Sequence, residues 1–553
     1  MFGRKKKVEG PVEACEPDEA EYKKKRSRTF IMIGLALGML LASLDQTVVG
    51  TSLPKIVGEI GGMSLFSWLF TAYMLAETIT IPIAGKMSDR FGRKPVFLAG
   101  MVLFMGGSFL AGMSNSMEML IICRFIQGLG GGALMPVAMA TVADLYAPTE
   151  RGKIQGMLGA VFAIATIIGP LMGGYIVDNA DWRWVFYVNL PVGVFAILVA
   201  SMKFPKLVNN DRRPIDYPGM VTLIGTLAPA LLVITWGGST YAWASAEIVG
   251  LIVLAVVSLV AFLMIEKRAS DPILPLYIFK EPIVSLASAG LFIMSLGMFG
   301  VISFLPLFLQ AVIGMSASNS GELIIPMMGG VMTTMLLSGF LLKWTGYKIW
   351  LLIGPPLAAL GLFLLSTLHA GSSQWDAILY LIITGAGLGA VMANFIVAAQ
   401  NVVCKKDMGV VTSSISLFRS IGGTVGVAAL GGLINGKMVE EMGKNLAPGV
   451  LQTLPTTDAN SVGQLLLMVT VPPVPAPILD AIRLSLSNSI TFAFFVGAII
   501  VLLSLVASVL VRSVPLKSAE EYHELEPKAD GPKGGAVEQP VLEAAHTIDG
   551  KGK

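Results

Sequence analysis

Fourteen long apolar stretches run through this chain of 553 residues and constrain its fold more than any other feature. A helix needs about 20 predominantly apolar residues to cross the hydrocarbon core of a bilayer. The expected spans are residues 30–50, 64–84, 95–113, 118–140, 153–175, 184–203, 217–236, 246–265, 283–309, 319–341, 347–368, 376–397, 409–434 and 489–512. The sequence therefore predicts an all-α membrane protein with 14 transmembrane helices.

The composition excludes an ordinary soluble protein. Hydrophobic residues make up 54% of the chain and charged residues 14%, against roughly 25% charged residues in a soluble domain. The formal net charge of +3 suggests no nucleic-acid partner. The sequence contains no phosphate-binding loop and no metal-spaced His/Cys cluster, so we expect neither an enzyme nor a cofactor. None of the three histidines lies in an apolar stretch, and proton chemistry within the membrane must therefore use carboxylates.

The placement of Lys and Arg predicts the orientation. If both termini are cytoplasmic, the short inner loops carry 17 Lys and Arg residues and the outer segments carry five. The positive-inside rule favours this arrangement, in a multi-pass protein of the plasma membrane. Residues 1–29 and 513–553 have the composition of disordered cytoplasmic tails. Residues 435–488 are expected to form one long external loop, which leaves room for a short interfacial helix near 478–487.

Two short inner loops resemble each other at an offset of 254 residues. The matching residues are Gly85, Gly92 and Lys94 in the first loop and Gly339, Gly346 and Lys348 in the second. Each loop would join the second and third helix of a six-helix bundle. The expected organisation is therefore a bundle over 30–203, a segment over 204–282 with an inserted helix pair, and a second bundle over 283–512.

Several motifs together resemble the major facilitator superfamily, specifically its fourteen-helix drug:proton antiporter branch. They are Gly85-Lys86-Met87-Ser88-Asp89-Arg90-Phe91-Gly92-Arg93-Lys94, Leu44-Asp45-Gln46-Thr47 with Leu53-Pro54, Arg124-x-x-Gln127-Gly128, Gly169-Pro170-x-x-Gly173-Gly174, and Trp182-Arg183-Trp184 with Asn189-x-Pro191. The resemblance covers roughly residues 30–515. It implies the major facilitator fold and a substrate site near the midplane, between the bundles.

The resemblance also implies a function. It favours proton-coupled efflux of amphipathic, often cationic drugs by alternating access. The expected partners are a small amphipathic substrate, protons and the lipid bilayer, and we expect a monomer. A dedicated exporter of a lipid, amino acid or other metabolite is the alternative on the same scaffold. A third reading is a non-transporting membrane sensor or enzyme.

Five ionisable residues within the expected spans are candidates for proton coupling or substrate binding. They are Asp45, Glu77, Arg124, Glu322 and Arg419. Each costs at least about 2.5–3.5 kcal/mol to insert. At about 1.5 Å per residue, Asp45 lies about 8 Å and Arg124 about 9 Å from the outer ends of their helices. They can therefore pair, either as a structural lock or as a proton-coupling element.

The other three are less constrained. Glu77 lies in the inner half of its helix and suits a second proton site, a site for a cationic substrate, or a carboxylate that snorkels or bonds a neighbour. Glu322 lies near an outer end, as a solvated residue or part of a negative vestibule. Arg419 lies near mid-membrane and needs a carboxylate, carbonyl or water partner. Its role is structural or coupling.

Two further groups of residues are candidates for conformational roles. Gly85, Asp89, Arg90, Gly92 and Arg93 form a cytoplasmic gate or, more simply, carry positive-inside charge. In the gate, which the resemblance implies, Asp89 would reach a helix end in the other bundle. Residues Gly169, Pro170, Gly173 and Gly174 resemble the antiporter motif. Close helix contact and a proline kink there would serve packing, a seal against proton leak, or both.

Overall fold

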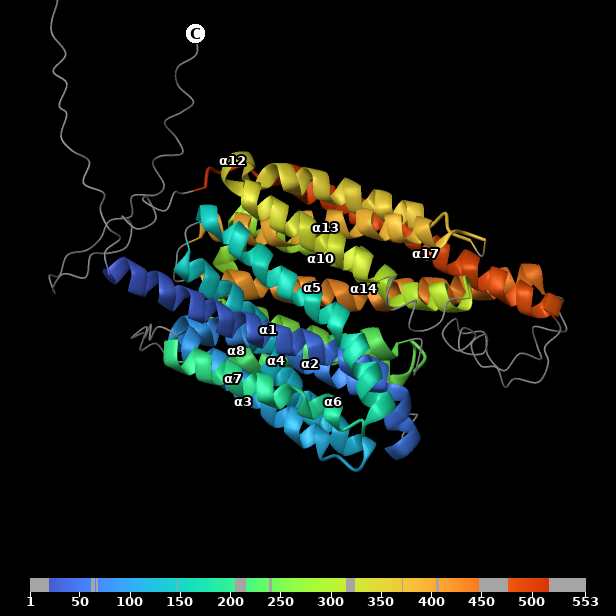
Figure 1. Cartoon of the computed structure of the whole chain (residues 1–553), viewed down its shortest axis with the longest axis horizontal. Helices are drawn as coiled ribbons and strands as arrows, with labels where there is room; N and C mark the ends of the chain where they lie inside the picture. Colours follow the sequence, from blue (N-terminus) through green and yellow to red (C-terminus); the bar gives the residue numbers. More distant parts are fainter. Residues whose placement is uncertain are drawn as a thin grey trace, which may run out of the picture.

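The computed structural model describes residues 19–60, 65, 68–146, 148–203, 215–237, 241–314, 324–369, 371–403, 407–446 and 476–516. These residues are almost entirely helical, and the long helices run side by side (Figure 1). The helices are α1 Glu19–Ile60, α2 Trp68–Phe91, α3 Arg93–Gly112, α4 Met117–Leu145, α5 Pro148–Asn179, α6 Trp184–Tyr187, α7 Asn189–Lys203, α8 Tyr217–Trp236, α9 Ala246–Glu266, the 3-10 helix η2 Leu276–Lys280, α10 Pro282–Ala311, α12 Ile324–Leu365, α13 Gln374–Val402, α14 Met408–Asn445 and α17 Ala476–Leu510.

Within the described residues, 12 helices are long and apolar enough to cross a membrane. Helix α2 overlaps the expected span 64–84 but is not among them. Helix α12 overlaps both expected spans 319–341 and 347–368, and Gly346 interrupts its helical geometry. The all-α prediction is confirmed for the described residues, whereas the number of 14 transmembrane helices stays a prediction.

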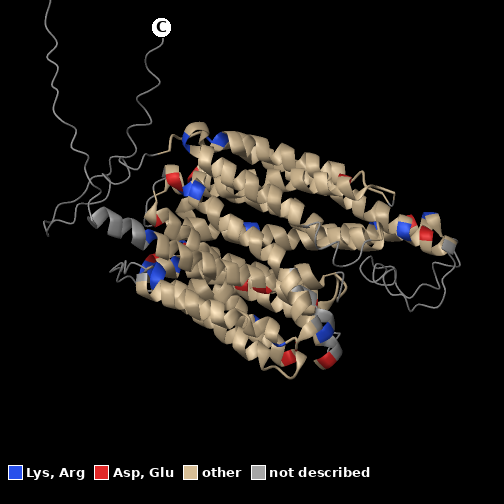
Figure 2. Ribbon diagram, in the orientation of Figure 1, with Lys and Arg blue, Asp and Glu red and all other residues tan. Residues whose placement is uncertain are grey.

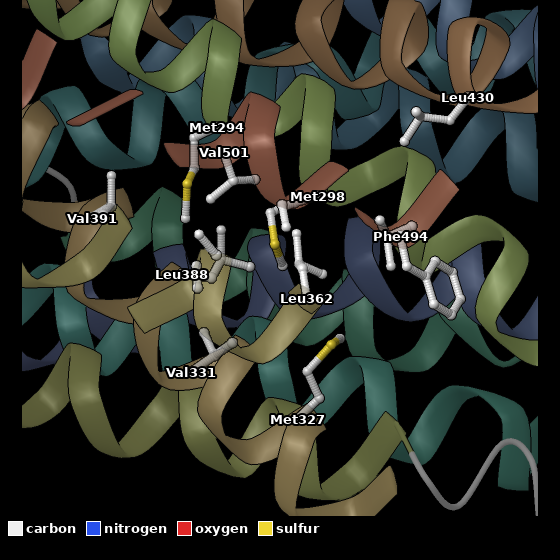
Figure 3. Packing of buried hydrophobic residues seen from close by; sticks show 14 of the residues in the cluster. Met294, Met298, Met327, Val331, Leu362, Leu388, Val391, Leu430, Phe494 and Val501 are labelled. Carbon is white, nitrogen blue, oxygen red and sulfur yellow. The ribbon is translucent and has the colours of Figure 1, made fainter. Parts of the chain in front are cut away.

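The helices pack in two groups. The first helix group is α1–α7, and the second is α10, α12, α13, α14 and α17. Figure 3 shows the apolar core of the second helix group, where Met294, Met298, Leu362 and Val501 pack together. Helices α8 and α9 pack on each other, and α8 contacts α2 and α14. Most of α9 stays exposed, as expected for a helix that faces lipid. The domain boundaries drawn from the sequence remain a prediction.

The two similar loops share an unusual backbone geometry. Gly92 has φ 92° and Gly346 has φ 67°, a region that favours glycine because it has no Cβ. Two residues later, Lys94 donates to the Ser201 carbonyl near the end of α7. Lys348 likewise donates to carbonyls near the end of α17. Each loop therefore holds the last helix of its own group, and the internal repeat seen in the sequence extends to the structure.

Both ends of the described chain lie at one end of the bundle, where α1 begins and α17 ends (Figure 1). We call this the terminal end. Figure 2 shows Lys, Arg, Asp and Glu mainly at the two ends of the bundle, with few in the middle. The sequence predicts that the terminal end faces the cytoplasm.

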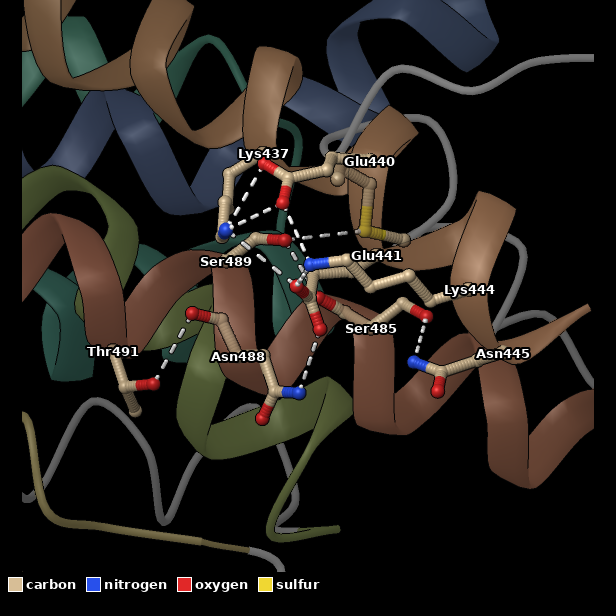
Figure 4. Close-up of polar contacts among 10 residues, drawn as sticks. Lys437, Glu440, Glu441, Lys444, Asn445, Ser485, Asn488, Ser489 and Thr491 are labelled. Atoms are coloured by element: carbon tan, nitrogen blue, oxygen red, sulfur yellow. Dashed lines mark hydrogen bonds and ion pairs between the residues drawn. The ribbon is translucent and has the colours of Figure 1, made fainter.

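The expected external loop 435–488 is helical at both of its ends. Helix α14 continues to Asn445 and α17 begins at Ala476, while residues 447–475 lie outside the described residues. Ion pairs one helical turn apart explain the extension of α14, since Lys437 and Lys444 both pair with Glu440 and Glu441 (Figure 4). The Asn488 side-chain amide donates to Glu441 at 2.9 Å and joins α17 to α14.

Candidate functional site

A buried polar centre lies inside the first helix group. Asp45 of α1 is 0% exposed and forms an ion pair with Arg124 of α4, which is 1% exposed. The other Asp45 oxygen accepts hydrogen bonds from Gln127 Nε2 at 2.8 Å and Asn189 Nδ2 at 2.9 Å. The Arg124 guanidinium also lies 4.3 Å from the centroid of the Tyr73 ring. The pairing of Asp45 with Arg124, expected from their equal depth, is present.

The sequence explains how these side chains converge. Arg124 and Gln127 are three residues apart on α4 and therefore share one face of the helix. Asn189 is the first residue of α7. The sequence did not indicate that Gln127 and Asn189 would donate hydrogen bonds to Asp45, although both residues lie in motifs quoted above. A buried pair of this kind is strongly destabilised when one partner is lost, because the other charge then stays buried alone.

Glu77 lies on α2 of the first helix group and Arg419 lies on α14 of the second. These two helices contact each other across the interface between the groups. Glu77 Oε2 accepts a hydrogen bond from Gln46 Nε2 at 3.0 Å, the neighbour-bonded form considered for this acid. The next residue on each helix joins the groups, because the hydroxyls of Thr78 and Ser420 lie 2.9 Å apart. Arg419 donates to the thioether sulfur of Met135 at 3.5 Å, and the expected carboxylate, carbonyl or water partner stays a prediction.

Asp89 connects the two helix groups at the terminal end. Its carboxylate accepts hydrogen bonds from the backbone amides of Gly409 at 3.1 Å and Val410 at 2.8 Å, at the start of α14. It also pairs with Arg93 at 2.6 Å, and Arg93 pairs with Asp144 of α4 at 2.8 Å. Burial raises the pKa of Asp89 to about 6, although Arg93 acts in the opposite direction. Asp89 thus reaches a helix end in the other group.

The neighbouring gate residues make different contacts. Arg90 and Lys86 both pair with Asp271, at 3.3 Å and 2.5 Å, in the segment that follows α9. Nothing in the sequence marked Asp271 as their partner. A Cβ atom at Gly85 would lie 2.4 Å from the Cβ of Ser413, so α2 touches α14 only because residue 85 is glycine. These contacts fasten the gate loop both to α14 and to the segment after α9.

A second contact between the groups joins α5 to α12 and α13. A Cβ atom at Gly339 would lie 2.4 Å from the carbonyl oxygen of Gly152. Arg151 donates to the Gln400 carbonyl at 3.3 Å, and the Gln155 amide donates to the Gln400 side chain at 3.0 Å. No motif in the sequence singled out Arg151, Gln155 or Gln400. In the part of the chain that is described, hydrogen bonds between the groups lie from the middle of the bundle to its terminal end.

The antiporter-like segment of α5 packs on α1. A Cβ atom at Gly169 would lie 1.9 Å from the hydroxyl oxygen of Thr47, so the two helices touch there. Gly173 is buried, whereas a Cβ atom at Gly174 would meet nothing within 4 Å. Pro170 belongs to α5, but its side chain lies outside the described residues, and so does Glu322.

Residues 35–427 match the family described as the Major Facilitator Superfamily. The chain belongs to this superfamily. Within it, the chain is 38% identical over 538 residues to the multidrug transporter protein MdtP of Bacillus subtilis, covering 94% of this chain and 98% of that protein. It is 32% identical over 502 residues to multidrug resistance protein 3 of the same organism, covering 90% of this chain and 98% of that protein.

Solved structures of the Major Facilitator Superfamily share the fold. The human organic anion transporter MFSD10 gives a TM-score of 0.60 at 14% identity, over 87% of this chain and 99% of that one. The proton:xylose symporter XylE gives 0.59 at 15% identity, over 91% of this chain and 99% of that one. These likenesses confirm the predicted fold. Membership of the superfamily makes the protein a multi-pass membrane transporter of small molecules rather than an enzyme, and its relatives are of the multidrug efflux type.

Proposed function

We propose that the protein exports amphipathic compounds from the cytoplasm in exchange for protons, by alternating access. The buried ion pair of Asp45 with Arg124 is the observation that carries this proposal. The two multidrug relatives support the choice of substrate class. The terminal end faces the cytoplasm of the plasma membrane in this proposal, in keeping with the distribution of Lys and Arg.

Asp45 is the proposed proton carrier. A proton on its carboxylate removes the charge that pairs with Arg124 and weakens the tie between α1 and α4. Asn189 links the same carboxylate to α7, so protonation acts on three helices at once. Glu77 is the second candidate acid. It accepts a hydrogen bond from Gln46, the residue that follows Asp45 on α1.

The contacts at the terminal end are the proposed gate. Asp89, with Arg93, Arg90 and the glycines at 85 and 92, holds α2 against α14 and closes the cytoplasmic side. The Asp89 carboxylate accepts these hydrogen bonds from the first amides of α14, where the helix dipole favours a negative charge. Substrate reaches the site from the cytoplasm only when these bonds break.

The contact of α5 with α1 is the proposed seal. Gly169 brings α5 against Thr47, two residues beyond Asp45 on α1. Gly173, Gly174 and Pro170 continue this segment of α5 and serve the same role in the proposal. A tight contact beside the proton carrier limits the path by which protons leak without substrate.

The test is transport into everted membrane vesicles, with amphipathic fluorescent dyes of both charges. We expect accumulation that an uncoupler abolishes and that Asp45→Asn reduces to the level of vesicles lacking the protein. Asp181→Asn makes the same chemical change on a half-exposed carboxylate and should transport normally. Accumulation that resists the uncoupler, or that survives Asp45→Asn, would refute proton coupling.

A further inference from the structure

A methionine-rich pocket lies between the two helix groups, where the proposed transport cycle needs a substrate site. In this conformation its cavity volume is about 20 Å³, room for about one water molecule, so the two helix groups must separate before a larger ligand can enter. Its walls come from α4 and α5 of the first helix group and from α10, α12, α13 and α14 of the second. The residues that matter for its chemistry are Met135, Met139, Met335, Met392, Gln155 and Arg419.

Arg419 is the ionisable residue among the side chains that line this methionine pocket. Its hydrogen-bond partner in the described structure is the sulfur of Met135, and a thioether is a weak acceptor. The contrast with the other buried arginines is clear. Arg124 pairs with the Asp45 carboxylate, and Arg151 donates to three backbone carbonyls. Among the described residues, the hydrogen bond to Met135 leaves the Arg419 guanidinium, which lines the pocket, without an ion pair.

The nearest candidate for a protein counter-charge is Glu77. Its charge acts on Arg419 through space, but the described side chains form no ion pair with each other. Glu77 is instead hydrogen-bonded to Gln46. A guanidinium in the middle of a membrane protein is unfavourable without an oxygen partner. A ligand that brings an accepting or anionic oxygen supplies that partner.

Gln155 provides a second unsatisfied group in the same pocket. It is 0% exposed, and its amide nitrogen donates to Gln400 at 3.0 Å. Its carbonyl oxygen is buried, and no hydrogen-bond donor among the described residues reaches it. Leaving such an atom unpaired costs about 1–3 kcal/mol, which a donor group on a ligand would recover. The pocket thus offers a cation and an acceptor on otherwise apolar walls.

The four methionines determine the rest of the ligand. Their side chains are flexible and polarisable, adapt to different shapes and make favourable contacts with aromatic rings. Resting on the proposed export function, we propose that the methionine pocket binds aromatic compounds that carry an anionic oxygen group, with Arg419 as the counter-charge. Carboxylates, sulfonates and phenolates are the groups that fit. This differs from the cationic substrate expected from the sequence.

Binding of two matched probes tests the proposal. Anilinonaphthalene sulfonate and N-phenylnaphthylamine share one ring system and differ by the sulfonate, while tetraphenylphosphonium represents lipophilic cations. Binding to the full-length protein in lipid nanodiscs is measured by equilibrium dialysis, with protein-free nanodiscs as the blank. We expect the wild-type protein to bind the sulfonate at least about tenfold more tightly than the cation, a difference of about 1.4 kcal/mol.

The variants separate charge from structure. Arg419→Gln should weaken binding of the sulfonate at least tenfold and change binding of N-phenylnaphthylamine less than twofold. Arg419→Lys should restore most of the sulfonate affinity. Lys437→Gln, the same change on the same helix but far outside the pocket, should leave all three affinities unchanged.

Three results would overturn the proposal. They are no sulfonate binding by the wild-type protein, tighter binding of tetraphenylphosphonium than of the sulfonate, and equal weakening of both matched probes by Arg419→Gln. The last result would mean that Arg419 is structural. These measurements need no proton gradient, so their failure leaves proton-coupled export standing. Conversely, loss of coupling in the vesicle test leaves the binding result unaffected.

Discussion

The gate contact of Asp89 predicts that acid favours closure of the terminal end. In the closed structure, burial raises the pKa of Asp89 from 3.8 to about 6. When the two helix groups separate, water reaches the carboxylate and its pKa returns toward the ordinary value. The closed conformation therefore binds the proton more tightly than the open one, so closure gains stability as the pH falls through about 6 and loses it as the pH rises.

The size of the effect follows from the two pKa values. Between about pH 7.5 and about pH 5, the closed form takes up most of one proton and the open form takes up little. The difference is about 1.4 kcal/mol, or about a tenfold shift toward the closed conformation. Asp89 is 10% exposed, so solvent screening reduces this figure little.

Distances between spin labels across the terminal end measure the shift. Phe91 on α2 and Trp344 on α12 are exposed and belong to different helix groups, so each can carry a label once the three native cysteines are replaced. The short-distance population should grow about tenfold relative to the long one on acidification. Asp89→Asn should remove most of this response. Growth of the long-distance population in acid, or an undiminished response in Asp89→Asn, would refute the reasoning.

Three other perturbations have definite expected outcomes. Asp45→Asn and Arg124→Leu should each lower the free energy of unfolding by about 3–5 kcal/mol, and the double variant by less than the sum, because the second change removes the orphaned partner. Thermal unfolding of the purified protein checks this, and strict additivity would contradict it. Gly85→Ala places a Cβ atom 2.2 Å from a side-chain oxygen of α14 and should reduce transport at least about tenfold, whereas Gly106→Ala, with open space around it, should not. Lys348→Met removes donors to carbonyls near the end of α17 and should speed hydrogen exchange in its last turn, with α13 as the internal reference.

Depth along a helix was readable from the sequence, and it predicted the central ion pair. Counted from the outer ends of their spans, Asp45 and Arg124 lie at a similar depth in the membrane. Because a buried charge is unfavourable without a partner, an ion pair between them was expected. The same count could not supply the rotation of each helix or its neighbours. The sequence therefore offered no way to name Met135 as a neighbour of Arg419, because the direction in which α14 faces decides which side chains Arg419 meets.

Hydropathy also fails to predict the parts of a helix that extend beyond its apolar stretch. The segments 435–445 and 476–488 have too many polar residues to look like spans, yet they continue α14 and α17. Ion pairs between Lys437, Lys444 and two glutamates stabilise the first extension, and contacts between the two helices stabilise the second. The expected spans come from long continuous apolar stretches, and polar residues interrupt both segments, so the sequence predicts a loop there with room for a short helix near 478–487 only.

The first glycine of each repeated loop contacts a helix of the other helix group. Gly85 on α2 touches α14, and Gly339 on α12 touches α5. Each helix group thus places the helix that leads into its repeated loop against a helix of the other group. The two contacts are reciprocal, so the interface between the groups depends on one close glycine approach from each side.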